Sequence, residues 1–373
     1  MSPIEFGFQL SAVDGAGTSD AGLYDALLKD AVLGQALGYS TAWVVEHHFS
    51  DYFPQPSPIA ILSHVAALCP GMGLGTMVLV TPWHQPVRLA GDIAVLSHLS
   101  RGPVHLGLGR GNAPMEYEAF GVPLAEAKQR FEETWRILQL AMQGGRFTFK
   151  GRTLSVDRDI EIRPRPMIDK INFYGAIGNP ASATKIANLG LAPISNGKLA
   201  FDVQREVLQT WQASAVQNGL SADVSKPVAV ALVIADTDAE ADKLARQQLP
   251  RWFEVQVEHY AYDAARHPDL PDYRPFAETH QRRVTLTNPA NLDPILDVSL
   301  VGSPTTIRRK LNEYIDIGFN SFILMTSLPD IPQTLRATWL TRFAREIAPE
   351  YVPSFARATS VRDRKPTLST AAE

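Results

Sequence analysis

Short apolar runs rich in β-branched residues alternate with longer runs of helical hydrophobic period along almost the whole chain. Eight of the short runs are expected to form strands: Ile4–Leu10, Ser40–Glu46, Gly73–Val80, Val104–Arg110, Ile171–Ala176, Ala192–Ser195, Pro227–Ala235 and Ser321–Thr326. The longer runs predict helices: Asp20–Leu37, Pro58–Leu68, Pro86–Leu99, Leu124–Met142, Pro180–Leu189, Asp202–Asn218, Asp236–Leu249, Pro304–Gly318 and Asp330–Ile347. Eight strand-helix units predict an α/β protein with a closed (β/α)8 TIM barrel.

Two strands, Gly73–Val80 and Pro227–Ala235, are apolar nearly throughout, which indicates a parallel sheet buried on both faces. Such a barrel needs roughly 250 residues, so a chain of 373 has room for insertions. Gly145–Arg163 (145–163) is expected to be a hairpin insertion, and the polar segment Glu258–Ser299 (258–299) a long mobile loop after strand 7. We expect one domain over residues 1–353 and a disordered tail over 354–373.

Composition narrows the possible partners. A hydrophobic content of 45% and a charged content of 20% are ordinary for a soluble globular protein. The net charge of −4, without any Lys/Arg-rich run, gives no reason to expect nucleic acid or a membrane as a partner. Cys69 is the only cysteine and lies in an apolar run, so it is expected to be a small buried hydrophobe. With no targeting pattern and no long apolar stretch, we expect a cytoplasmic protein.

Two histidines follow the second predicted strand, at the face where TIM barrels carry their active sites. His47 and His48 must point in opposite directions, because side chains alternate along a strand. Only one of them can therefore face a site. We assign His47 to the site and His48 to a structural, hydrogen-bonded position, which is also the alternative explanation for His47.

Two further strand ends predict a site for phosphate. Arg110 ends the fourth strand between Gly109 and Gly111, and a guanidinium matches the geometry of phosphate oxygens. After the fifth strand, Gly178-Asn179-Pro180 opens a helix with Ser182 in its first turn, where free N–H groups favour an anion. A surface ion pair of Arg110 and a tight strand-helix connection are the alternative explanations.

These residues belong to a series of motifs that resembles the bacterial-luciferase-like flavin monooxygenases. The motifs are Trp43–Phe49 (Trp-Val-Val-Glu-His-His-Phe), Gly75–Val80, Pro86–Arg88, Gly107–Gly111 and Val301–Pro304. Their order and spacing match the family over about residues 4 to 345, which is more specific than any one motif. Flavin-using members characteristically carry Glu-His-His-Phe at the position of residues 46–49, whereas deazaflavin relatives usually depart from it.

The resemblance implies roles for individual residues. His47 corresponds to the catalytic histidine, and Met77–Val78 to a non-prolyl cis peptide under the flavin ring. The cofactor-binding residues would be Met77, Val78, Arg110, Ala176, Gly178, Asn179 and Ser182. The substrate pocket would include Phe8, Trp43, Ala113 and Trp252, and no metal ion is expected. Gly109 and Ala113 depart from the cysteine and tyrosine of the luciferases themselves, so light emission with an aldehyde is not expected.

The implied reaction is oxygenation of a small organic substrate by reduced FMN (FMNH2) and O2 through a C4a-peroxyflavin. The chain has no Gly-x-Gly-x-x-Gly turn for a nicotinamide nucleotide, so a separate NAD(P)H:flavin reductase is expected to supply FMNH2. The resemblance also implies a homodimer through Pro58–Leu68 and Pro86–Leu99.

Other functions compete with this interpretation. An F420-dependent (deazaflavin) oxidoreductase on the same fold and a non-catalytic flavin-binding homologue remain as alternatives. A metal-dependent barrel hydrolase would carry His-x-His on the first strand, where Phe6-Gly7-Phe8 stands. A retaining glycosidase would carry carboxylates where Arg110 and Ala235 stand, so neither hydrolase is favoured.

Overall fold

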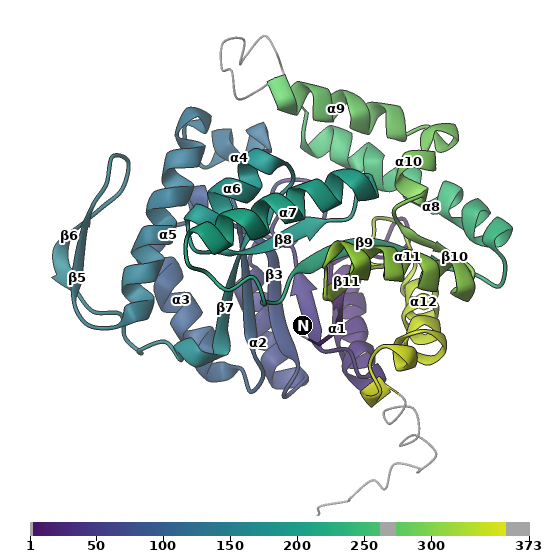
Figure 1. Ribbon diagram of the computed structural model, residues 1–373, viewed down its shortest axis with the longest axis horizontal. Coiled ribbons are helices and arrows are strands. Elements are labelled where there is room, and N and C mark those ends of the chain that lie inside the picture. Colours follow the sequence, from purple (N-terminus) through teal and green to yellow (C-terminus); the bar gives the residue numbers. More distant parts are fainter. Residues whose placement is uncertain (1–2, 262–273, 356–373) are drawn as a thin grey trace, which may run out of the picture.

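The computed structural model describes residues 3–261 and 274–355 and contains a closed barrel of eight parallel strands (Figure 1). The barrel strands are β1 (Glu5–Gln9), β2 (Thr41–Val44), β3 (Gly73–Val80), β4 (Val104–Gly109), β7 (Ile171–Ile177), β8 (Ala192–Asn196), β9 (Pro227–Ile234) and β11 (Ser321–Met325). Strand β1 pairs with β2 and β11, and the pairing of β8 with β9 closes the ring. The predicted TIM barrel is confirmed.

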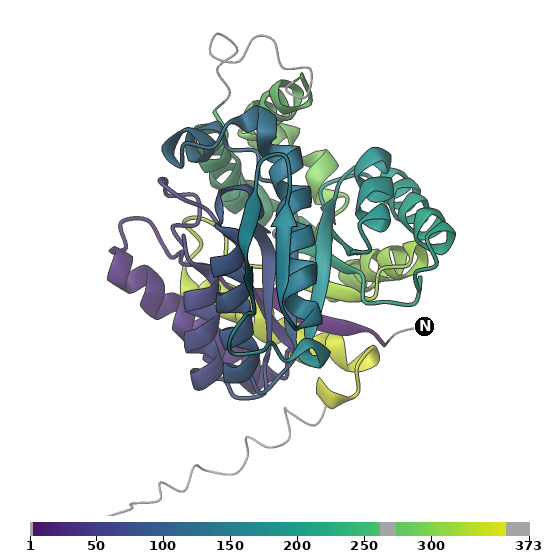
Figure 2. The same cartoon turned by 90° about the vertical axis from the view of Figure 1, so that its left-hand side faces the viewer.

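Helices surround the barrel on its outer side (Figure 2). The long ones are α1 (Asp20–Leu37), α2 (Pro58–Leu68), α3 (Pro86–Leu99), α5 (Ala127–Gln143), α6 (Pro180–Asn188), α7 (Phe201–Gln217), α8 (Asp238–His259), α11 (Pro304–Ile317) and α12 (Gln333–Glu346). Short helical segments fill the connections: α4 (Pro114–Ala119), η1 (Thr81–Trp83), η2 (Leu124–Glu126), η3 (Ile168–Lys170), η5 (Pro289–Asn291), α10 (Asp293–Leu296) and η6 (Ala348–Glu350). Within the described ranges, none of the helices combines the length and apolar content that crossing a bilayer requires.

Local sequence signals explain where these helices begin and end. The Ser19 side chain accepts a hydrogen bond from the Gly22 N–H at the start of α1, and Ser303 caps α11 in the same way. Gly38 ends α1 with a φ of 93°, a left-handed conformation that glycine adopts without steric cost. For α1 and α11, whose ends carry these capping residues, the predicted bounds fall within one residue of the observed ones.

The register of β1 decides which of its side chains face the barrel interior. A Cβ on Gly7 would lie 2.7 Å from the indole nitrogen of Trp43, so Gly7 points inward and leaves room for that ring. Because side chains alternate, Phe6 and Phe8 point outward to the helices. Phe8 packs on Tyr39, with ring centroids 5.5 Å apart, and is fully buried.

The first and last long helices, α1 and α12, are joined by a buried ion pair. Arg336 of α12 donates to Asp30 of α1 through a short hydrogen bond, and both side chains are completely buried. The expected tail over 354–373 begins slightly too early, because Phe355 is 2% exposed and packs on Tyr39 at 5.3 Å between ring centroids. The rest of that predicted tail, 356–373, lies outside the described residues.

The first insertion is the predicted hairpin. Strands β5 (Phe147–Lys150) and β6 (Ser155–Ile160) pair antiparallel and extend from the body of the molecule (Figure 1). The carboxylate of Glu133 on α5 accepts hydrogen bonds from the backbone N–H groups of Arg152, Thr153 and Leu154 in the hairpin loop. These hydrogen bonds to Glu133 hold the hairpin loop against α5.

The second insertion differs from the expected loop over 258–299. Helix α8 continues through Pro250 to His259, and α9 (Arg274–Leu286), α10 and the short strand β10 (Leu300–Gly302) follow. Beyond Pro250, the buried side chains of Trp252, Phe253 and Val255 hold α8 in place, and α9 packs against α8. A polar composition therefore concealed helical structure, and residues 262–273 of the predicted loop lie outside the described residues.

Candidate active site

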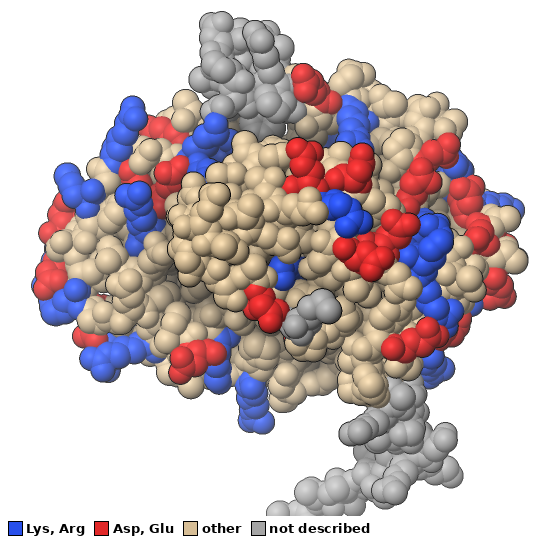
Figure 3. Space-filling view, in the orientation of Figure 1, with Lys and Arg blue, Asp and Glu red and all other residues tan. Residues whose placement is uncertain are grey.

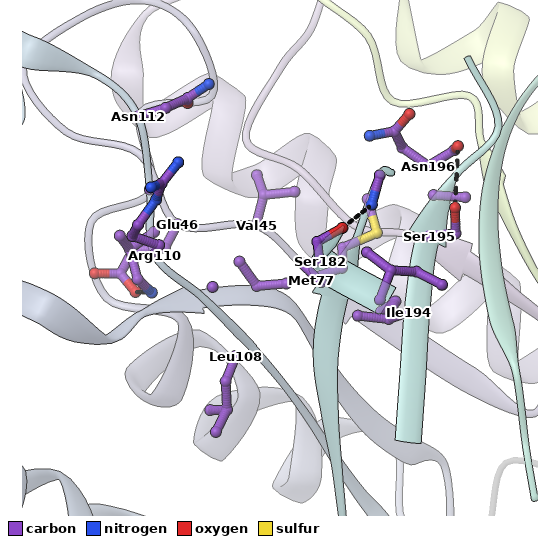
Figure 4. Close-up of a pocket in the computed structure, with 18 of the residues that line it drawn as sticks. Val45, Glu46, Met77, Leu108, Arg110, Asn112, Ser182, Ile194, Ser195 and Asn196 are labelled. Atoms are coloured by element: carbon purple, nitrogen blue, oxygen red, sulfur yellow. Dashed lines mark hydrogen bonds between the residues drawn. The ribbon is translucent and has the colours of Figure 1, made fainter. Parts of the chain in front are cut away.

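A cavity of about 790 Å³ opens at the carboxyl ends of the barrel strands (Figure 4). Its walls include apolar side chains from five strands or their ends: Val45, Leu108, Ile194, Ala229 and Met325. Helices α8 and α9 contribute the wall beside the β9 end of the barrel. This volume lies within the range of about 300–1,000 Å³ that small-molecule sites occupy.

Most of the site residues predicted from the sequence line this cavity. They are His47, Met77, Val78, Arg110, Ala176, Gly178, Asn179, Ser182 and Trp252. The peptide bond between Met77 and Val78 is cis, as the family resemblance implies.

Three predicted pocket residues do not line the cavity. Phe8 points outward to α1, because Gly7 takes the inward position on β1. Trp43 does point inward, but it lies two residues before Val45 and is enclosed by Tyr174 and His105 in a deeper layer of the barrel. Ala113 is the N-cap residue of α4 and is fully buried. Their assignment to the substrate pocket is corrected.

The start of α6 forms a cradle of hydrogen-bonding groups in the cavity wall. Asn179 and Ser182 make a capping box, in which Ser182 Oγ accepts from the N–H groups of Gly178 and Asn179 at 3.0 Å. Asn179 Oδ1 in turn accepts from the Ser182 N–H at 2.9 Å. A Cβ on Gly178 would meet no atom within 4 Å, so the cradle is open to an incoming group.

Three cationic side chains line the same cavity as this helix start. Arg110 follows β4, and its backbone carbonyl accepts a short hydrogen bond from the Tyr117 hydroxyl. Lys128 of α5 and Lys185 of α6 line the same cavity, and sequence reasoning did not identify either. Lys185 forms an ion pair with Glu132, 2.5 Å away, and a cationic wall beside a helix start suits an anion such as phosphate.

His47 lies beyond the end of β2, and its side chain is 14% exposed. Burial, followed by the nearby groups His259, His48 and Lys198, holds its pKa well below the usual 6.5. The imidazole is therefore neutral near pH 7. Among the described residues, its Nδ1 has no hydrogen-bond partner.

Glu46 anchors the segment that carries His47. Burial acts to raise its pKa, but hydrogen bonds from His48, His84 and the Val80 N–H outweigh that effect and lower it to about 2. His48 Nε2 lies 3.1 Å from Glu46 Oε1, in agreement with the structural position assigned to His48. Trp83 Nε1 also donates to this carboxylate, at 3.0 Å. Glu46 thus joins the end of β2 to the segment after β3.

Two groups beside His47 were missed from the sequence. Glu116 of α4 accepts from the His48 N–H at 2.8 Å, and its Oε1 lies 3.9 Å from His47 Nδ1 and 3.5 Å from His259 Nε2. Burial raises the pKa of Glu116 to about 8 and lowers that of His259 to about 3. Near pH 7, a protonated carboxyl group therefore sits between two neutral imidazoles. His47, Glu116 and His259 each offer a ligand-type atom, all within 4.8 Å of one another.

One sequence signal pointed to His259. Trp252, Gln256 and His259 are spaced i, i+4 and i+7, which places them on one face of a helix. Ending the predicted helix at Leu249 hid that spacing. Glu116 gives no comparable signal, because it lies in a six-residue helix that the pattern did not predict.

The fold is thus a TIM barrel in which a helix start, Arg110 and His47 line one cavity at the strand ends. The sequence matches the model of the luciferase-like monooxygenases over residues 4–321. The chain therefore belongs to the luciferase-like monooxygenase family, whose members include flavin-dependent monooxygenases.

Individual relatives share about a quarter to a third of their residues with the matched part of this chain. The chain is 36% identical over 149 residues to the uncharacterized protein y4vJ of Sinorhizobium fredii, a match that covers 40% of this chain and 42% of that protein. It is 26% identical to 4-hydroxyprotoasukamycin monooxygenase of Streptomyces nodosus subsp. asukaensis, over 80% of this chain and 83% of the relative. The oxygenase component of flavin-dependent trigonelline monooxygenase from Acinetobacter baylyi is 28% identical over 39% of this chain and 42% of the relative.

Solved structures show the same fold at low identity. Monooxygenase RslO1 from Streptomyces bottropensis superposes with a TM-score of 0.78 and 21% identity, covering 94% of this chain and all of that one. The oxygenating constituent of 3,6-diketocamphane monooxygenase from Pseudomonas putida, in complex with FMN, gives 0.73 and 20%, over 94% and 99%. An F420-dependent secondary alcohol dehydrogenase gives 0.72 and 14%, over 95% and 99%.

Proposed function

We propose that this protein uses reduced FMN and O2 to transfer one oxygen atom to a small organic substrate, and that a separate NAD(P)H:flavin reductase supplies the FMNH2. The observation that carries the proposal is one cavity shared by the α6 cradle with Arg110, the Met77–Val78 peptide and the neutral His47.

The cavity fits the proposed cofactor. The cradle has unsubstituted backbone at Gly178, and Arg110 and two lysines, of which Lys185 is paired with Glu132, line the same cavity; such a set suits a phosphate group. Apolar side chains such as Val45, Leu108 and Val78 offer a surface for a flat ring. When bound, the flavin would supply the activation of O2 and the oxygen transfer, which this chain's side chains do not perform themselves.

The protein's own residues would position and protect the reactants. Arg110 and the start of α6 would hold the phosphate, and Val45, Met77 and Trp252 would exclude water from the ring. His47 is neutral near pH 7, so it can accept or return a proton within the cavity. A protonated Glu116 behind it keeps a negative charge away from that imidazole.

Two features support the proposed partners. The chain has no Gly-x-Gly-x-x-Gly turn, and one relative is named as the oxygenase component of a flavin-dependent monooxygenase. For a homodimer, the carboxyl-terminal halves of α2 and α3 expose Leu68, Val95 and Leu99, which are 40%, 44% and 52% exposed. Exposed apolar side chains on neighbouring helices suit a subunit contact.

An F420-dependent oxidoreductase is the second candidate, because one structural neighbour is such an enzyme. A direct comparison separates the two. We expect FMNH2, reduced chemically without NAD(P)H, to bind the purified chain and to consume O2, and we expect reduced F420 not to do so. A requirement for NAD(P)H bound to this chain would contradict the two-component proposal.

The Arg110→Ala variant tests the cradle. Loss of a charged hydrogen bond should weaken FMNH2 binding by about 1.5–3 kcal/mol, or roughly 10- to 150-fold in Kd. An anaerobic fluorescence titration measures this Kd. Arg101→Ala is the matched control, because Arg101 is exposed and precedes the amino end of β4, whereas Arg110 follows its carboxyl end. Equal affinities of the Arg110→Ala variant and the wild type would remove Arg110 from the cofactor site.

A further inference from the structure

Two further cations, Lys198 and Arg283, line the same cavity. Lys198 lies between β8 and α7, and its Nζ sits 3.9 Å from the centroid of the Trp252 ring and 3.2 Å from Gln256 Oε1. Arg283 of α9 places its guanidinium carbon 4.0 Å from the centroid of the Tyr260 ring. All of these side chains line the cavity. Two cations from different elements are thus held over aromatic rings at one end of it.

Among residues 3–261 and 274–355, no carboxylate forms an ion pair with Lys198 or Arg283; their described partners are the Trp252 and Tyr260 rings and Gln256. Burial, and after it the positive charges of Arg283 and Arg282, lowers the pKa of Lys198 to about 7. The carboxyl group behind His47, Glu116, is protonated near pH 7 and offers no compensation. Placing an anion between Lys198 and Arg283 would relieve this cost.

The shape of this end indicates what the anion is attached to. Tyr52, Trp252 and Tyr260 line it, and the Tyr52 and Tyr260 rings are 5.6 Å apart at an interplanar angle of 67°. His47 lies 4.5 Å from the Tyr52 ring, between centroids. A flat unsaturated group among these rings would therefore lie beside the imidazole proposed to act in the reaction.

Lys198 and Arg110 come from different parts of the barrel. Arg110 and Ser182 come from the β4 and β7 sides of the barrel, whereas Lys198 follows β8 and faces α8 and α9. In Figure 4, Arg110 and Asn112 lie on one side of the cavity and Asn196, two residues before Lys198, lies on the other, with Met77 between them. Ser182 lies beside Met77 in the same view, between Arg110 and Asn196.

We propose that the substrate is a small organic carboxylate with a flat unsaturated body, whose carboxylate binds Lys198 and Arg283 while the body lies among Tyr52, Trp252 and Tyr260 next to His47. This inference rests on the proposed function and names the substrate class of that same site. It does not depend on which bond of the substrate is oxygenated.

Benzoate and benzamide are the probes, because they have the same shape and differ in charge. Calorimetric titration of the full chain near neutral pH, with and without bound FMN, should show benzoate binding at least about tenfold more tightly than benzamide. Lys198→Met and Arg283→Met should each weaken benzoate binding by about 10- to 100-fold and leave benzamide binding unchanged, as expected for loss of one charged hydrogen bond. Lys243→Met is the control, because Lys243 is exposed on the same helix as Trp252.

The outcomes separate this proposal from the proposed function. Equal affinity for the two probes, or no binding of benzoate, overturns the carboxylate site while leaving the FMNH2 titration to decide the function. Benzoate binding that is lost in Arg110→Ala but kept in Lys198→Met assigns the anion to the phosphate cradle and also overturns it. If Lys198→Met instead weakens FMNH2 and not benzoate, this end belongs to the cofactor. Thermal unfolding of each variant shows that it is folded.

Discussion

Replacing Glu46 by glutamine should destabilise the protein and remove part of the acid dependence of its stability. Glu46 is 1% exposed and receives hydrogen bonds from the Val80 N–H at 2.8 Å, Trp83 Nε1 at 3.0 Å and the imidazole of His84 at 2.8 Å. Its pKa falls from 4.5 to about 2 in the folded state. A difference of about 2.5 in pKa corresponds to about 3 kcal/mol of folding free energy that the ionised form contributes.

The sign of the pH dependence follows from that lowered pKa. A carboxyl group with a folded pKa below its unfolded value contributes its full stabilisation above about pH 4.5, and loses it as the pH falls through about 2. His84 acts in the opposite sense: burial acts to lower the pKa of its imidazole, but the hydrogen bond and charge of Glu46 outweigh burial and raise it, so its contribution is lost as the pH rises through that folded value. Between these limits the pair is charged and at its most stable.

Denaturant unfolding at a series of pH values measures both effects. At pH 7 we expect Glu46→Gln to lower the free energy of unfolding by about 3 kcal/mol, and to flatten the loss of stability between about pH 5 and pH 2. Glu206→Gln serves as the control, because Glu206 is exposed on α7. If the free energy of unfolding fell equally steeply with decreasing pH in Glu46→Gln and in wild type, the view that hydrogen-bond donors hold this carboxylate ionised would be refuted.

Two further perturbations test the charge states of other buried groups. Glu116→Gln mimics the protonated carboxyl, so FMNH2-dependent turnover at pH 7 should change by no more than a few-fold. A fall in wild-type activity above about pH 8 should be absent from the variant, and an unchanged alkaline limb in its pH–rate profile would exclude this role. Arg336→Met leaves Asp30 buried without its cation and should lower the free energy of unfolding by about 3–5 kcal/mol. The control Arg309→Met, at an exposed ion pair on α11, should change that free energy by less than about 1 kcal/mol. Equal denaturation midpoints of Arg336→Met and wild type would show that the buried pair contributes nothing.

The order of strands and helices was predictable from the sequence for a physical reason. Strands buried on both faces, such as β9, must be apolar throughout, and the helices between them carry visible start signals at Ser19 and Ser303. That Arg110 and Ser182 line one cavity was predictable in the same way, because parallel strands bring their carboxyl ends to one face whatever the details of packing.

The incorrect predictions concern features that depend on the register of a strand or on contacts between distant parts of the chain. Whether Phe8 faces the cavity is decided by Gly7, which takes the inward position because Trp43 fills the space beside it. Helix α8 passes through Pro250, and its last turns are held by buried contacts of Trp252 that no local propensity expresses. His259 was lost with those turns, and Lys198 gives no pattern, since it reaches the cavity from a connection between β8 and α7.

Glu46 and Glu116 show how the same side chain takes opposite charge states a short distance apart. Both are buried and both bind His48, which contacts Glu46 through its imidazole and Glu116 through its backbone N–H. Glu46 receives donors from His48, His84, Trp83 and Val80 and stays ionised, whereas Glu116 receives only the His48 N–H among the hydrogen bonds of the described residues and keeps its proton. The number of donors outweighs burial in one case and not in the other. The ionised carboxylate therefore holds the segment that carries His47, while the neutral one lies beside that imidazole without adding a negative charge.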